Sequence, residues 1–291
     1  MRKRVRGTAS GGVVSRFEAT YLPLDEERLH LGQVAVLNWD AEIFGFRVAD
    51  YRPGTLAKLI SRANQLADQF EHWARRERVE LISCRVPSEP AALGALLESI
   101  GFRFIEFQLR ATLPRLRVEE QLPSRITVRP ARAADHEGVA RIAGSAFMLG
   151  RYHADPLFPR PLADRRYRVW VERALAEPSP GTLVQVVGLE GAPHGFLHAE
   201  IEREMADIRL AAVDGSAAGI AGPELFRGAL RELASRGASQ ATARISATNT
   251  AVLNIYASLG FRFHEPELVF HWHAPTATHL VPLAGVLTQT S

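Results

Sequence analysis

Apolar and polar residues alternate in the first half of the chain with two distinct periods. From Leu56 to Ala74 the apolar positions follow a helical period, and charged residues cover the opposite face. Shorter apolar runs are typical of strands, and Gly101 follows a helical segment as a terminating residue. The pattern predicts strands at 34–37 and 44–51 around a turn at Trp39 and Asp40, a helix over 56–74, a strand at 79–84, a helix at 91–99 and a strand at 102–113.

The second half of the chain has a mixed order of elements. The pattern predicts a strand at 126–128, a helix at 135–147, a Pro-rich loop at 151–161, a helix that ends near 175, strands at 183–187, 195–202 and 206–213, a Gly/Ala loop, a helix at 223–234, a strand at 240–246, a helix from 249 and a strand at 261–271. This order predicts an α/β (α+β) fold, in which helices cover a mostly antiparallel sheet with one parallel crossover.

A segment near the end of the chain has a copy in the first half. Residues 90–104 repeat the frame of residues 249–263 at an offset of 159, and Gly-Phe-Arg-Phe occurs in both. The copy has Pro90 in place of Asn249 and Leu97 in place of Tyr256. Shared positions are those that a helix, turn and strand require, so the differing polar residues, Asn249 and Tyr256, are candidates for chemistry.

Length and composition set limits on the class of protein. At 291 residues, with an internal repeat, we expect two domains, at residues 1–116 and 124–291, joined by a linker near 114–123. The formal charge is +3, and the Arg residues are scattered among acidic ones, which does not favour nucleic-acid binding. No apolar run resembles a membrane span or a signal peptide, so we expect a cytoplasmic protein, and a homodimer stays open.

Cysteine chemistry is not expected. The single cysteine, Cys84, lies in an apolar strand, which predicts burial and offers no disulfide framework. We expect no metal cofactor.

The second half resembles the GNAT acyltransferase family over residues 126–273, and the first half looks like a truncated copy of the same unit. The resemblance rests on the element order, the Gly/Ala loop after the fourth strand of the second half, and the Asn-to-Tyr helix ending in Gly-Phe. Residues 38–45, 145–147 and 151–152 further resemble the TDP-fucosamine acetyltransferase subgroup. The resemblance implies a tandem GNAT fold and acetyl transfer from acetyl-CoA to a small-molecule amine acceptor, such as the amino group of a nucleotide-linked sugar.

Acyl transfer needs an acid for the departing thiolate, and the resemblance assigns that role to Tyr256. A phenol with an ordinary pKa near ~10 can protonate a thiolate of similar basicity. The alternative is a tyrosine that fills a groove. Asn249 would bind the cofactor arm, or act as a helix N-cap, or both.

The Gly/Ala loop would hold the diphosphate of coenzyme A, because unpaired N–H groups at a helix N-terminus bind phosphate. The expected cofactor-binding residues are Ala211, Val213, Gly219, Ile220, Ala221, Gly222 and Asn249. The loop departs from the family pattern, and Pro223 has no N–H to offer. A plain strand-to-helix turn is the alternative.

The general base is less clearly indicated. Strand alternation places His198 and Glu200 on one face of the strand at 195–202, where they could face a cleft. Glu200 ranks first by the resemblance, and a solvated sheet face or a water chain is the alternative.

The loop after Gly150 is the candidate acceptor site. Arg151, Tyr152, His153 and Asp155 supply a cation, an aromatic face and polar groups that suit a nucleotide sugar. A surface loop held by its prolines is the other interpretation. Two further functions stay open: a GNAT that acts on another small amine or acyl donor, and a degenerate GNAT that binds a ligand without turnover.

Overall fold

The computed structural model describes residues 19–24, 31–116, 126–215 and 218–281. Its described strands form one sheet in the order β1-β2-β3-β4-β11-β5-β10-β9-β8-β7-β6. Most neighbours are antiparallel, and the parallel pairs are β3 with β4 and β9 with β10. Helices flank this sheet, which confirms the predicted α/β fold.

The first half of the chain supplies β1 to β5. Its elements are β1 (Leu22–Pro23), β2 (Gly32–Val36), α1 (Asn38–Phe44), β3 (Arg47–Pro53), α2 (Leu56–Ile60), α3 (Ala63–Glu77), β4 (Val79–Pro87), α4 (Ala91–Ser99) and β5 (Arg103–Leu113). The predicted turn at Trp39 and Asp40 is wrong, because both residues lie in α1, which Gly45 ends in a left-handed conformation (φ 80°). The predicted long helix is interrupted at Ser61 and Arg62.

The second half follows the expected order of elements. These are β6 (Val128–Pro130), η1 (Ala133–Asp135), α5 (His136–Ala146), α6 (Arg151–Ala154), α7 (Arg160–Ala176), β7 (Thr182–Leu189), β8 (Ala192–Glu202), β9 (Met205–Val213), α8 (Ala218–Ser235), β10 (Gln240–Ser246), α9 (Thr250–Ser258) and β11 (Arg262–His273). Two differences concern the candidate site. The Pro-rich loop begins with the short helix α6, and α8 begins at Ala218 rather than at Pro223.

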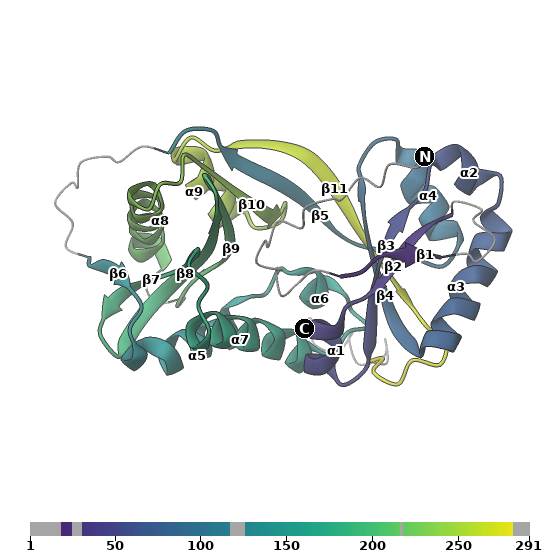
Figure 1. The fold of residues 1–291 in the computed structure, drawn as a ribbon, viewed down its shortest axis with the longest axis horizontal. Coiled ribbons are helices and arrows are strands. Elements are labelled where there is room, and N and C mark those ends of the chain that lie inside the picture. Colours follow the sequence, from purple (N-terminus) through teal and green to yellow (C-terminus); the bar gives the residue numbers. More distant parts are fainter. Residues whose placement is uncertain (1–18, 25–30, 117–125, 216–217, 282–291) are drawn as a thin grey trace, which may run out of the picture.

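Two lobes share the sheet through a pair of long strands. We call β1–β4 with α2–α4 the first lobe, and β6–β10 with α5, α7, α8 and α9 the second lobe. Figure 1 shows β5 and β11 running from one lobe to the other. Strand β5, from the first half of the sequence, pairs with β10, and β11, from the end of the chain, pairs with both β5 and β4. The division of the sequence at 116 and 124 stays a prediction.

The predicted repeat is confirmed as a structural repeat. The bounds of α4 and α9 match at the offset of 159, as do the first residues of β5 and β11. Gly101 (φ 95°) and Gly260 (φ 83°) both adopt the left-handed conformation that ends their helices. Leu97 and Tyr256 are both buried, so this one of the two polar differences between the copies lies inside the molecule.

A small core joins the two lobes beside the candidate acceptor loop. Phe44 of α1 lies edge-on to Tyr152 (ring centroids 5.0 Å apart) and to Phe158 (4.9 Å). Ile43, Val48, Leu81 and Ala163 complete the buried cluster. Aromatic packing of this kind fixes the orientation of the rings, so the position of α6 is set by contacts with the first half of the chain.

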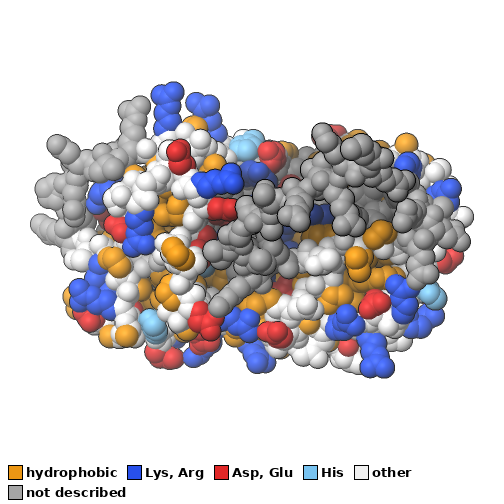
Figure 2. Space-filling view, in the orientation of Figure 1, with side chains coloured by type: hydrophobic (Ala, Val, Ile, Leu, Met, Phe, Trp, Pro, Cys, Tyr) orange, Lys and Arg blue, Asp and Glu red, His pale blue; other side chains and the backbone are white. Residues whose placement is uncertain are grey.

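Three further features concern the surface charge, the helices and the cysteine. On the face drawn in Figure 2, Lys and Arg side chains lie among Asp and Glu side chains over both lobes. Within the described part of the chain, none of the helices combines the length and apolar character needed to span a membrane. Cys84 is buried as predicted, and burial raises the pKa of its thiol.

Candidate active site

The site begins where two parallel strands of the second lobe separate. The parallel register of β9 and β10 runs from Met205 and Gln240 to Ile208 and Ala243 and ends there, although both strands continue. A bulge between the partners of Ile208 and Leu210 lies at the same level of β9. Ala211 and Val213 therefore lie on the arm of β9 beyond the separation. Main-chain groups on that side of the arm have no neighbouring strand from β10, so they can bind an extended ligand.

A cavity of about 1120 Å³ opens between the lobes at this point. Its lining includes Asp207 to Leu210 of β9, Arg244 of β10, Arg151 and Tyr152 of α6, and Trp39 and Asp40 of α1. The volume is slightly above the usual range of roughly 300 to 1,000 Å³ for small-molecule sites. Both halves of the sequence contribute walls, so the cavity exists only in the assembled two-lobe fold.

Tyr256 lies in α9 with its ring enclosed by aromatic neighbours. Phe261 is stacked on it (4.5 Å) and Phe226 of α8 lies edge-on (5.2 Å). Burial, and then the carboxylate of Asp207, raise the pKa of the phenol well above its ordinary value. The expected ordinary pKa of Tyr256 is therefore wrong. The phenol stays protonated throughout the neutral range, so in a proton transfer there it can act as an acid but not as a base.

The two candidate bases on β8 contact each other and do not line the cavity. His198 is buried, and its Nε2 lies 3.1 Å from Glu200 Oε1. Thr182 (2.9 Å) and Ser179 (3.1 Å) also donate to the Glu200 carboxylate. Burial opposes its ionisation, but hydrogen bonds from His198 and Thr182 outweigh burial and lower the pKa of Glu200. A carboxylate held by several donors is a weak base.

Asp207 is the carboxylate that the pattern analysis missed. It pairs across the sheet with Glu200 but lines the cavity, and its Oδ2 lies 3.1 Å from Arg209 Nε. Asp207 and Arg209 alternate with apolar Ala206, Ile208 and Leu210 along β9. That period-two pattern was the available signal, and it shows one polar face of a strand without showing what the face borders.

The predicted phosphate-binding segment lies in the first turns of α8. Because the helix begins at Ala218, its first four N–H groups belong to residues 218–221, which include Gly219, Ile220 and Ala221. Pro223 follows them and removes none of these donors. Residues 216 and 217 of the expected loop lie outside the described residues. Gly222 lies where α8 approaches α9, since a Cβ there would be 3.4 Å from Ile255 Cδ1.

Asn249 is the N-cap of α9. Its Oδ1 accepts a hydrogen bond from the main-chain N–H of Val252 (3.3 Å). The capping role that the sequence left open is thus confirmed, and the Nδ2 group is the part of the side chain that a ligand could use.

Of the four candidate acceptor residues, Arg151 and Tyr152 line the cavity. The Tyr152 hydroxyl donates to Asp40 Oδ2 (2.9 Å), Arg166 Nε donates to Asp40 Oδ1 (2.6 Å), and Arg151 lies 3.6 Å from the same carboxylate. Asp40 is 3% exposed, and it comes from the first half of the chain. It therefore ties α1 to α6 and α7 at the wall of the cavity.

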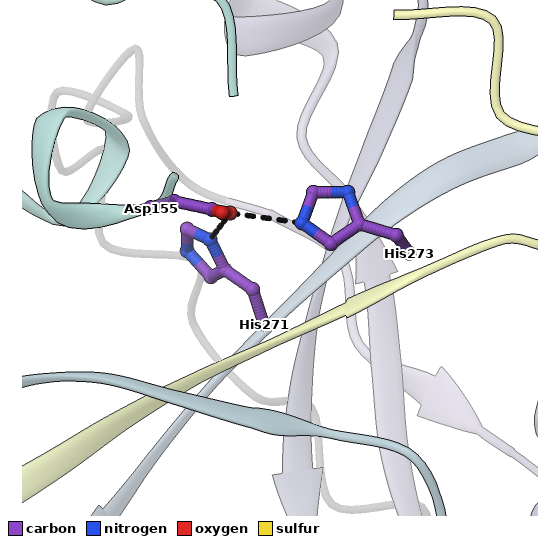
Figure 3. A group of neighbouring side chains, drawn as sticks. All are labelled: Asp155, His271 and His273. Atoms are coloured by element: carbon purple, nitrogen blue, oxygen red, sulfur yellow. Dashed lines mark hydrogen bonds and ion pairs between the residues drawn. The ribbon is translucent and has the colours of Figure 1, made fainter. Parts of the chain in front are cut away.

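His153 and Asp155 are buried behind this wall and are absent from the lining. His153 Nε2 bonds to Asp164 (2.8 Å). Asp155 accepts from His271 Nδ1 (2.7 Å) and His273 Nε2 (2.8 Å), both on β11, as Figure 3 shows. Burial opposes ionisation of Asp155, but these hydrogen bonds hold the pKa of the carboxyl well below its ordinary range. A direct role in acceptor binding would need these groups to reach a cavity that they do not line.

Asp155, His271 and His273 are also residue types that hold metal ions. One oxygen of Asp155 lies at hydrogen-bond distance from both imidazoles, and in the described part of the chain Nε2 of His271 has no hydrogen-bond partner. A metal-bound histidine normally donates its second N–H to a neighbour. The geometry fits a buried hydrogen-bond network, which continues through His279 to Glu80 (3.1 Å for each contact).

Comparisons with known proteins identify the fold. No family model matches the sequence, and no curated protein does. A GCN5-related N-acetyltransferase from Sphaerobacter thermophilus is similar with a TM-score of 0.60 at 14% identity, over 84% of this chain and 76% of that one. A GCN5-related N-acetyltransferase from Kribbella flavida has a TM-score of 0.56 at 15% identity, over 90% and 93% of the two chains.

A tandem GNAT protein from the clavulanic acid biosynthesis pathway is similar with a TM-score of 0.51 at 13% identity, over 84% of this chain and 79% of that one. The chain therefore has the fold of GCN5-related N-acetyltransferases, and the tandem arrangement has a solved counterpart. Fold alone does not assign an activity, which depends on the site.

Proposed function

We propose that the protein transfers an acetyl group from acetyl-CoA to the amine of a small molecule. The observation that carries this proposal is the separation of β9 from β10 after Ile208 and Ala243, together with a large cavity that Asp207 lines. The phenol of Tyr256 is buried and absent from that lining, but the charge of Asp207 acts on its pKa. An acyl transfer needs bound substrates, a base and a proton donor.

Acetyl-CoA would bind along the separated arm of β9 and at the start of α8. Ala211 and Val213 would offer main-chain groups to the extended part of the cofactor, and Asn249 its Nδ2. The diphosphate would lie at the N-terminus of α8, where Gly219, Ile220 and Ala221 carry N–H groups without partners inside the helix and the helix dipole favours an anion. Gly222 lets α9 approach this end of α8 closely.

The reaction proceeds by direct attack of the amine on the thioester carbonyl carbon. The new C–N bond forms, the C–S bond breaks, and the sulfur receives a proton from Tyr256, which is protonated at neutral pH. The amine loses its proton to Asp207, directly or through water. Glu200 and His198 stand one strand away and help to position β8 against β9.

The acceptor that the cavity suits best is an amino sugar linked to a nucleotide. Arg151 and Tyr152 supply a cation and an aromatic ring at one wall, and Trp39 and Arg166 lie beside them (4.9 Å from ring to guanidinium). Cations and aromatic faces are the groups that diphosphates and bases require. His153 and Asp155 would act indirectly, by holding α6 in place.

The test has two stages. Calorimetric titration with coenzyme A and acetyl-CoA should show binding, and a thiol-release assay over TDP- and UDP-linked amino sugars, aminoglycosides and amino acids should then identify the acceptor. Absence of binding at millimolar coenzyme A would overturn the acyltransferase proposal. Binding of acetyl-CoA with turnover only on a neutral or cationic amine would retain the reaction and reject the nucleotide sugar.

A further inference from the structure

The charges around the cavity are unequal. Eight arginines line it against five carboxylates, an excess of three positive charges, and the lining contains neither Lys nor His. The arginines are Arg47, Arg52, Arg76, Arg85, Arg151, Arg166, Arg209 and Arg244, and the carboxylates are Asp40, Asp50, Glu77, Asp207 and Glu267. A cavity lined by one sign of charge concentrates ligands of the opposite sign.

Two carboxylates are each shared by a pair of arginines. Asp40 binds Arg166 (2.6 Å) and lies 3.6 Å from Arg151, and Glu267 lies 3.0 Å from Arg244 and 3.8 Å from Arg85. Each group of three therefore keeps one net positive charge. The two groups are near each other, since the charge of Arg151 acts on Arg85.

Arg85 and Arg244 use only part of their donor capacity. Both approach Glu267 through Nε, and Arg85 Nε also donates to Gln108 Oε1 (3.1 Å). A guanidinium has five N–H donors. Among the described residues, the terminal nitrogens of both arginines have no protein acceptor, so they are available to a ligand. Burial, and then the charges of Arg151 and Arg244, lower the pKa of Arg85 to about 10. A bound anion would relieve that repulsion.

The cluster lies next to the reaction centre. Arg244 directly follows Ala243, the last residue of β10 that pairs with β9, and Arg209 follows Ile208 on the other strand. An acceptor held by these arginines has one end at the point where the strands separate. Its amine can then reach the space bordered by Asp207.

We infer that the amine acceptor carries an anionic oxygen group, a phosphate or a carboxylate, bound between the Arg85–Arg244 pair and the Arg151–Arg166 pair. That the bound molecule is the acceptor rests on the proposed acyl transfer, whereas the anion site follows from the cavity alone. Paired guanidinium groups bind such oxygens in a bidentate manner. Two net charges suit a diphosphate better than a single carboxylate.

Calorimetry on the full chain tests the site, with coenzyme A at saturation so that the start of α8 is occupied. Pyrophosphate and succinate are the probes, and wild type should bind at least one of them. Arg244→Gln should weaken binding roughly tenfold or more. Arg244→Lys should weaken it less, because lysine keeps the positive charge and loses only the bidentate geometry of the guanidinium. Arg227→Gln, at an exposed ion pair on α8, is the matched control and should bind as wild type does.

The outcomes separate this inference from the proposed function. Binding of pyrophosphate alone assigns a phosphate group, and binding of succinate alone assigns a carboxylate. If neither binds, or if Arg244→Gln and Arg227→Gln behave alike while circular dichroism shows both folded, the anion site is wrong, even when coenzyme A binds. If coenzyme A does not bind, the probes are titrated without it, and Arg244-dependent binding then retains the anion site while the acyltransferase proposal fails.

Discussion

Replacing Tyr256 with phenylalanine should separate chemistry from folding. The change removes one hydroxyl and leaves the ring between Phe226 and Phe261, where it contributes to the core of the second lobe. Burial and the charge of Asp207 account for the raised pKa of the phenol, with no hydrogen bond to a described residue contributing. The free energy of unfolding should therefore change by less than about 1 kcal/mol.

The expected loss of turnover is much larger. A positioned general acid contributes roughly 10²- to 10⁴-fold to the rate, so Tyr256→Phe should raise the activation barrier by about 3 to 5 kcal/mol. The KM for acetyl-CoA should stay within about twofold, because the hydroxyl acts on the sulfur only as the bond breaks. In wild type, the raised pKa predicts no loss of activity from ionisation of Tyr256 up to about pH 10.

Steady-state thiol release and urea unfolding measure the two effects on the same preparations. Ser258→Ala is the matched control, because it removes an exposed hydroxyl from the same helix, where Ser258 bonds to the carbonyl of Ile255 and to no other described residue. It should leave both turnover and stability nearly unchanged. A Tyr256→Phe enzyme that is folded, binds acetyl-CoA and turns over within about threefold of wild type would refute the acid assignment.

Three further predictions concern stability. Asp155→Ala leaves two buried imidazoles without their shared acceptor, so the free energy of unfolding in urea should fall by about 3 to 5 kcal/mol. The control Glu137→Ala, at an exposed ion pair, should lower it by less than about 1 kcal/mol. Equal decreases would contradict the network. Burial lowers the pKa of His271 and of His279, so the unfolded chain binds their protons more tightly and stability should fall as the pH drops below about 6.5. Stability should fall again below about 4, because the pKa of Asp155 is lower in the folded protein than in the unfolded chain. A urea midpoint that stays constant from pH 7.5 to 5.5 would contradict the histidine effect. A Cβ at Gly228 would lie 2.6 Å from Val128 Cγ1, so Gly228→Ala should lower the free energy of unfolding by about 1 to 3 kcal/mol and lower the Tm. In Gly222→Ala, on the same helix, the new Cβ would lie 3.4 Å from Ile255, so the Tm should not fall. Similar Tm values for the two variants would contradict the packing of α8 on β6.

Local features of the chain were predictable because neighbouring residues produce them. The repeat at offset 159, the two helix-ending glycines and the cap at Asn249 depend on contacts within a few residues. Periodicity likewise located β7, β8, β9 and α9 to within a few residues. The errors were local as well: α1 in place of a turn, and an earlier start of α8, where Gly and Pro residues are ambiguous signals.

The candidate site needed the tertiary structure. Asp40 meets Arg166 across 126 residues, and Asp155 meets His271 across 116, because β5 and β11 cross between the lobes. Strand periodicity assigns a face to Asp207 and Glu200 but cannot tell that one borders a cavity while the other is held by Thr182 and Ser179. The fold class and the candidacy of Tyr256 could be predicted from the sequence alone. Long-range strand pairing decided which charged side chains line the cavity, because only that pairing brings the two halves of the chain together.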